Sequence, residues 1–148
     1  RMKRVYLDVC ALCRPFDDQS QARIRAESTS IDLILNAARR KKIELVVSSA
    51  HDAEVKAIRD AEERYQLNMR LAMLGSRVEF DRHAAQRRAD ELVLKGFGIA
   101  DAAHVAIAEQ VEADFISVDD RLLRKCMRHA MKVWCGTPLA FCDREGLR

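Results

Sequence analysis

Short apolar runs alternate with longer stretches in which apolar and polar residues recur with a helical period. The runs at 4–9 (RVYLDV), 43–48 (IELVVS) and 114–118 (DFISV) consist mainly of aliphatic and aromatic residues, which is typical of buried strands. A run at 131–135 (MKVWC) predicts a closing strand, and 77–80 (RVEF) predicts a short extended segment. The chain is therefore expected to place several short strands along its length.

Helices are expected between these strands, because apolar side chains recur there at spacings of three and four residues and capping residues stand at the ends. In the first helix, Ile24, Ile31, Ile34 and Leu35 form one apolar stripe. The predicted helices cover residues 20–42, 50–60, 62–74, 82–96, 98–112 and 119–129. Strands that alternate with helices predict an α/β fold with an open, mostly parallel central sheet and helices on both faces.

Composition supports one ordered domain. The 148 residues are 49% hydrophobic and 33% charged, with only 5 Gly and 2 Pro, and a chain of this length can bury a substantial core. We expect a single domain over residues 2–148. No stretch approaches the roughly 18 apolar residues of a membrane span, and no signal peptide is evident, so a cytoplasmic protein with no membrane association and with reduced cysteines is expected.

The charge is mildly basic and unevenly distributed. The net charge of +3 permits a polyanionic partner without requiring one. Basic residues gather in three groups, each of which, taken alone, is more typical of solvated helix ends and faces: Arg39, Arg40, Lys41 and Lys42; Arg87 and Arg88; and Arg121, Arg124, Lys125 and Arg128.

Carboxylates stand where an open parallel sheet binds its ligands, beyond the carboxyl ends of the strands near the reversal of strand order. Asp8 ends the first strand, and Asp119 and Asp120 follow the strand at 114–118. Asp101 lies in the first turn of one predicted helix, and Glu54 about one turn into another. Converging carboxylates repel one another unless a cation holds them, and hard oxygen ligands favour Mg²⁺ or Mn²⁺.

The segments that carry these acids resemble a known family. VYLDVCALCRPFDD, SSAHDAEV, GIADAAHVAIAE and FISVDDRLL are similar to the acidic motifs of PIN-domain ribonucleases, most closely the VapC-like toxins of type II toxin–antitoxin systems. The resemblance extends over nearly the whole chain. It implies a single PIN-like domain and a metal-dependent endoribonuclease that hydrolyses RNA phosphodiester bonds.

The resemblance also assigns residues and partners. It places Asp8, Glu54, Asp101 and Asp119 in the catalytic cluster that binds Mg²⁺ or Mn²⁺, and Ser117 matches the hydroxyl position two residues before the last Asp. Which of Asp119 and Asp120 turns into the site stays open, and the other would cap the following helix. Cys10 departs from the pattern, because many members have Asn, Ser or Thr there, and a thiol is a poor hydrogen-bond partner. Members of this family often form homodimers and are held inactive by a small antitoxin protein, so both are expected here.

The helical spacing after Asp119 suggests where the RNA substrate would bind. Arg121 and Lys125 lie four residues apart on one helix face, close to the expected metal site, and could hold phosphates of a single-stranded or loop RNA. Aromatic residues make up only 5% of the chain, so base stacking offers little specificity.

Other interpretations stay open at this stage. Each acid could be only a helix cap or a solvated charge, and His104, one turn after Asp101, could be a ligand or base but more often would be a packed helix histidine. Cys10 and Cys13 form a CxxC pair, which is compatible with a thiol oxidoreductase. A phosphatase with Asp8 as nucleophile would need a second Asp at the position of Cys10. A catalytically decayed PIN scaffold that binds RNA or protein is the remaining alternative.

Overall fold

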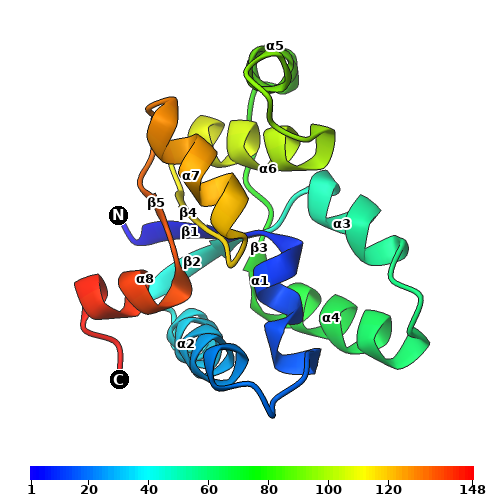
Figure 1. The fold of residues 1–148 in the computed structure, drawn as a ribbon, viewed down its shortest axis with the longest axis vertical. Helices are drawn as coiled ribbons and strands as arrows, with labels where there is room; N and C mark the ends of the chain where they lie inside the picture. Colours follow the sequence, from blue (N-terminus) through cyan, green and yellow to red (C-terminus); the bar gives the residue numbers. More distant parts are fainter.

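A computed structural model describes all 148 residues and places a five-stranded sheet at the centre of the molecule (Figure 1). Its strands are β1 (Lys3–Leu7), β2 (Ile43–Val46), β3 (Gly75–Ser76), β4 (Asp114–Ile116) and β5 (Cys135–Gly136). Their order is β3-β2-β1-β4-β5, and all four pairings are parallel. Because β1 lies between β2 and β4, the strand order reverses at the carboxyl end of β1.

Nine helical segments surround the sheet. They are α1 (Val9–Cys13), the 3₁₀ helix η1 (Arg14–Phe16), α2 (Ala22–Arg39), α3 (Ser49–Lys56), α4 (Ala61–Leu74), α5 (Arg82–Leu94), α6 (Ile99–Gln110), α7 (Asp120–Arg128) and α8 (Pro138–Glu145). The predicted α/β class with helices on both faces is confirmed, and the sheet is entirely parallel. No helix has the length and apolar character needed to cross a membrane.

Side chains of β1 point alternately into two cores. Val5 and Leu7 pack in the core beneath α2, α4 and α8, whereas Tyr6 packs in the core beneath α5, α6 and α7. Figure 1 shows these two helix groups on opposite sides of the sheet. This alternation is expected of a strand that is covered on both faces, because successive side chains point in opposite directions.

Two strands lie elsewhere than the sequence predicted. The third strand is Gly75–Ser76 and not 77–80, and the last is Cys135–Gly136 and not 131–135. A Cβ at Gly75 would stand 2.2 Å from Cγ2 of Val47, so the close approach of β3 to the segment after β2 requires glycine here. The position of β3 thus depends on the space that Gly75 leaves for its neighbours. The apolar pattern in the sequence had instead favoured residues 77–80.

Three helical segments were not predicted, and the helices expected at 20–42 and 50–60 are shorter in the structure, where α2 spans Ala22–Arg39. The apolar run after Asp8 forms α1 and η1, because Asp8 caps a helix directly after β1 and a short apolar run does not distinguish helix from strand. The helix expected at 50–60 ends at Lys56. Helix α8 carries ordinary signals, with Thr137 as N-cap, Pro138 in the first turn and left-handed Gly146 after the end.

Candidate active site

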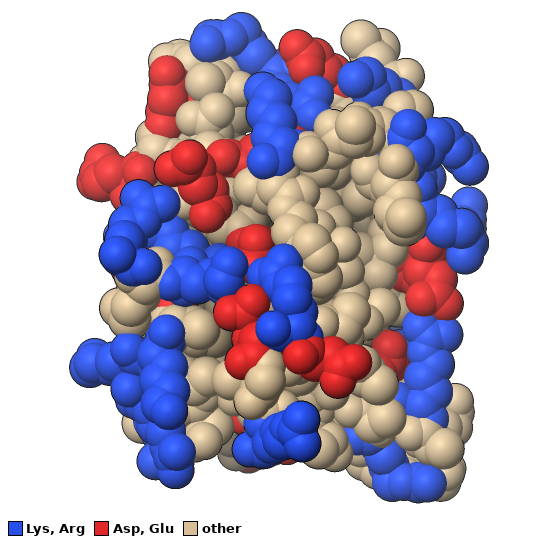
Figure 2. Space-filling model, turned by 90° about the vertical axis from the view of Figure 1, so that its left-hand side faces the viewer, with Lys and Arg blue, Asp and Glu red and all other residues tan.

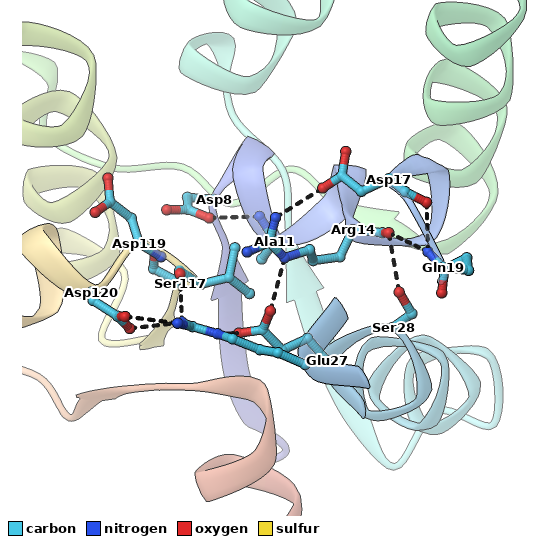
Figure 3. A network of polar contacts seen from close by, with 12 residues as sticks. Asp8, Ala11, Arg14, Asp17, Gln19, Glu27, Ser28, Ser117, Asp119 and Asp120 are labelled. Atoms are coloured by element: carbon cyan, nitrogen blue, oxygen red, sulfur yellow. Dashed lines mark hydrogen bonds and ion pairs between the residues drawn. The ribbon is translucent and has the colours of Figure 1, made fainter. Parts of the chain in front are cut away.

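Four carboxylates from four helices converge at the carboxyl edge of the sheet. Asp8 follows β1 and caps α1, and Asp119 follows β4 and caps α7. Asp101 lies in the first turn of α6 and Glu54 in the second turn of α3. Burial and the charges of all four raise the pKa of the Cys10 thiol to about 11, so all four acids lie within electrostatic reach of Cys10. Asp8 and Asp119 face the same space in Figure 3.

Asp8 is the most deeply buried of the four, at 3% exposure. Its Oδ1 accepts a hydrogen bond of 2.9 Å from the backbone N–H of Ala11. Burial raises the pKa of Asp8 to about 6; the charge of Asp101 acts in the same direction, and the polar groups of Ser117 and Ala11 oppose the rise. The carboxylate is thus fixed in orientation while its negative charge is poorly compensated.

Asp101 is half-buried and also carries uncompensated charge. Burial raises its pKa, the charges of Asp119 and Glu54 raise it further, and Lys125 lowers it. The effect of Lys125 places a half-buried cation from α7 beside the acids. An excess of negative charge at two neighbouring sites is what a bound cation would relieve.

The structure distinguishes Asp119 from Asp120. Asp119 Oδ1 accepts hydrogen bonds from the N–H of Arg121 (3.0 Å) and of Leu122 (3.2 Å), and its charge acts on Asp101. Asp120 instead forms a two-pronged ion pair with Arg23, with N–O distances of 2.9 and 2.8 Å. The Asp119 carboxylate therefore belongs to the acidic cluster and that of Asp120 does not.

Ser117 and a network around Glu27 hold this part of the site in place (Figure 3). The fully buried hydroxyl of Ser117 accepts a hydrogen bond of 3.0 Å from the N–H of Asp119. The buried carboxylate of Glu27 accepts from Arg14 Nε at 2.9 Å and from Arg23 Nε at 3.3 Å. Because Arg23 also binds Asp120, the network joins η1 and α2 to the first turn of α7. Sequence analysis missed it, since its partners lie up to 97 positions apart.

Glu54 is held by His104, which sequence analysis had interpreted as a packed helix histidine. The Nε2 of His104 lies 2.6 Å from Oε1 of Glu54, and this hydrogen bond lowers the pKa of Glu54. His104 is also buried, at 1% exposure. It is thus both packed and bonded to the acidic cluster, and its spacing of three residues from Asp101 was the only sequence signal.

Comparison with known proteins gives the fold. No family model matches the chain, and no curated protein matches it in sequence. Among solved structures, FitAcB from Neisseria gonorrhoeae superposes with a TM-score of 0.57 and 19% identity over 91% of this chain and 98% of that one. PAE2754 from Pyrobaculum aerophilum superposes with a TM-score of 0.53 and 16% identity over 98% and 97%. Both are PIN-domain proteins.

The fold is that of a PIN domain. The resemblance carried by the acidic motifs is thereby confirmed at the level of the fold. Identities of 19% and 16% leave the roles of individual residues to be argued from the geometry of this chain.

The acidic cluster of this PIN fold suits a hard divalent cation in its chemistry. Carboxylate oxygens are the preferred ligands of Mg²⁺ and Mn²⁺, and burial, with a smaller effect of neighbouring carboxylates, raises the pKa of Asp8 and of Asp101. As the side chains are placed, no three His, Cys, Asp or Glu residues stand close enough together to hold an ion. Asp119 uses Oδ1 to cap α7 and Glu54 uses Oε1 to accept from His104, so each would offer its other oxygen to an ion, and the carboxylates would have to move closer together around it.

The cysteines of the CxxC pair are poor candidates for redox chemistry on this PIN fold. Both are free thiols, and burial raises the pKa of Cys10 to about 11 and that of Cys13 to about 12, with neighbouring carboxylates adding to the rise. Since thiol–disulfide exchange needs the thiolate, both thiols are largely inert near neutral pH. The geometry thus disfavours a thiol oxidoreductase.

Proposed function

We propose that the protein is a Mg²⁺- or Mn²⁺-dependent endoribonuclease and the toxin of a toxin–antitoxin pair. The observation that carries the proposal is the convergence of Asp8, Glu54, Asp101 and Asp119 at the reversal of strand order of a PIN fold. The structural neighbour FitAcB is a toxin–antitoxin complex, which supports an antitoxin partner for this chain.

Asp8, Asp101, Asp119 and Glu54 would hold the cation. When bound, the cation supplies Lewis-acid polarisation of a phosphate and a water of lowered pKa. The chain's own contribution is to orient these acids. The N–H of Ala11 fixes Asp8, and Ser117 with the first turn of α7 fixes Asp119. No side-chain nucleophile is required, which agrees with the protonated thiol of Cys10 beside the acids.

Basic side chains near the cluster would bind phosphates on either side of the scissile bond. Arg121 is exposed in the first turn of α7, and Lys125 follows one turn later, close enough to lower the pKa of Asp101. On the face toward α8 and β5, Lys and Arg stand in separate groups with Asp and Glu between them (Figure 2). That face carries the N-terminus (Figure 1), so it lies at the amino edge of the sheet, away from the acidic cluster, and its mixed charges form no single basic surface.

The direct test is cleavage of a labelled single-stranded RNA by the purified protein. We expect internal cleavage with Mg²⁺ or Mn²⁺, no cleavage with EDTA, and restoration when the metal is returned. RNA binding without cleavage under any of these conditions would contradict the proposal and favour a decayed PIN scaffold that only binds.

Charge reversal of Arg121 tests the substrate path. Arg121→Glu should weaken binding of single-stranded RNA and make log affinity less steep against log salt by about 0.7, because one phosphate contact is lost. The control is Arg39→Glu, since α2 ends at Arg39 shortly before β2 begins, at the opposite edge of the sheet. Fluorescence anisotropy at several salt concentrations measures both variants. Equal losses in the two would show diffuse attraction without a defined path.

A further inference from the structure

A chain of buried polar side chains runs from the core to the acidic cluster. Tyr6 of β1 is fully buried, and its hydroxyl lies 2.8 Å from Oγ of Ser48 and 2.5 Å from Nδ1 of His104. The other ring nitrogen of His104, Nε2, lies 2.6 Å from Oε1 of Glu54. Sequence analysis gave no role to Tyr6, and burying a hydroxyl and an imidazole is unfavourable unless each finds partners.

The direction of these hydrogen bonds follows from what each group can do. A neutral imidazole carries one N–H, and the Glu54 carboxylate only accepts, so the proton lies on Nε2 of His104. Nδ1 then accepts from the hydroxyl of Tyr6, whose oxygen accepts in turn from the hydroxyl of Ser48. Glu54 therefore selects the tautomer of His104, and Tyr6 supports it by donating to the ring nitrogen that carries no proton.

The second buried histidine, His51, has a different arrangement. Its Nδ1 accepts from the backbone N–H of Ser48 at 3.1 Å, and its Nε2 donates to the carbonyl of Leu7 at 2.7 Å. Its ring packs on Tyr6 with the centroids 4.5 Å apart. His51 thus joins β1 to the start of α3 without touching a carboxylate, which makes it a matched structural control for His104.

His104 can influence the cluster only by positioning Glu54. Both of its ring nitrogens are engaged, so neither is free to bind a metal or to take a proton from water. The hydrogen bond uses Oε1 of Glu54, whereas Oε2 has no protein partner and the side chain remains 34% exposed. The charge of Glu54 nevertheless acts on Asp101, which places it at the cluster.

We propose that Tyr6 and His104 form a positioning relay that fixes the carboxylate of Glu54 and presents its free oxygen to a divalent cation held by the acidic cluster. The inference rests on the proposed metal-dependent function. Tyr6 and His104 are positioning residues, and the relay adds no proton-transfer step. Hydrogen bonds to metal-ligating carboxylates of this kind typically change metal affinity by about 10- to 100-fold.

Calorimetric titration with Mn²⁺ tests the relay without relying on activity. His104→Leu should lower Mn²⁺ affinity by about 10- to 100-fold. His104→Gln keeps an N–H donor near the position of Nε2 and should recover affinity to within about threefold of wild type. His51→Leu, the control, should leave Mn²⁺ affinity nearly unchanged while lowering thermal stability in EDTA. An equal loss of affinity in His51→Leu and His104→Leu, or no rescue by Gln, would overturn the relay.

A double-mutant cycle asks whether His104 acts through Glu54. In a Glu54→Ala background, His104→Leu should cause less than about a twofold further loss of Mn²⁺ affinity, because the group it positions is gone. A full further loss would overturn the relay. If His104→Leu does not fold, Tyr6→Phe takes its place. It removes only the hydroxyl that donates to Nδ1 of His104, and we expect about a 3- to 10-fold loss of Mn²⁺ affinity, whereas unchanged affinity would overturn the proposal.

The results separate the relay from the proposed function. Wild-type protein that binds no Mn²⁺ would overturn both. Wild-type protein that binds Mn²⁺ and cleaves RNA, with His104→Leu unchanged in Mn²⁺ affinity, would overturn the relay alone. Wild-type protein that binds Mn²⁺ but cleaves no RNA would overturn the ribonuclease assignment, and the binding data would still decide the relay.

Discussion

Replacing Asp8 by Asn should remove RNA cleavage and at the same time stabilise the metal-free protein. Asn can still cap α1 by accepting from the N–H of Ala11, so the local structure should persist. What disappears is a carboxylate that the cation would need. We expect at least about a 100-fold loss of cleavage, at or beyond the upper end of the effects typical of outer-shell residues.

The gain in stability follows from the pKa of Asp8, which burial raises from 3.8 to about 6. Because the raised pKa means that the folded state binds the proton more tightly, the stability that this group contributes is full below about pH 4 and is lost as the pH rises through 6. The shift corresponds to a cost of about 2–3 kcal/mol at pH 7.5. Asp8→Asn should recover most of it at pH 7.5 in EDTA and almost none at pH 4, as urea denaturation at the two pH values would measure.

Asp114→Asn is the matched control, because this aspartate begins β4 at the opposite edge of the sheet and pairs with Lys3 and Arg144. We expect wild-type cleavage from it. Cleavage by Asp8→Asn at the wild-type rate, still suppressed by EDTA, would remove Asp8 from the metal site. A denaturation midpoint of Asp8→Asn that shows no greater gain at pH 7.5 than at pH 4 would contradict the buried-charge argument.

Removing Arg88 should cause a large loss of stability. Its guanidinium forms two hydrogen bonds to the carboxylate of Glu109, at 2.7 and 3.2 Å, which joins α5 to α6. The side chains are only 11% and 2% exposed, so Arg88→Ala leaves a buried charge whose remaining partner is the N–H of Lys132. Breaking a buried pair from one side costs roughly 3–5 kcal/mol, and we expect about 3 kcal/mol because the Lys132 hydrogen bond remains.

The neighbouring arginine provides the control. Arg87 is exposed, so Arg87→Ala should change stability by less than about 0.5 kcal/mol. Urea denaturation measures both variants, and the difference should appear in the midpoint with an unchanged slope. A loss below about 1 kcal/mol for Arg88→Ala would mean that the pair is screened in solution. The two arginines form one basic group in the sequence, but only Arg88 is largely buried.

The features that sequence analysis identified are those with local signals. Strand–helix alternation was visible because the periods of strands and helices act over a few neighbouring residues, and the bounds of α4, α5 and α6 agree closely with the pattern. Three of the acidic positions were visible because Asp8 and Asp119 follow strands and Asp101 opens a helix, whereas Glu54, inside α3, was assigned by the family resemblance. The two-residue strands β3 and β5 carry no period at all, so their places were missed.

The sequence by itself thus determined the α/β class and the positions of the four acids along the chain. Only the tertiary structure decided their partners. Asp120 is turned to Arg23, which is 97 positions away, and Glu54 is bonded to His104, 50 positions away. Arg88 donates hydrogen bonds to the buried Glu109, 21 positions away. Such pairs form because the order of the parallel strands brings helices that are distant in the sequence together. Charged side chains that become buried there must then pair with one another. Neither effect produces a periodic pattern in the local sequence.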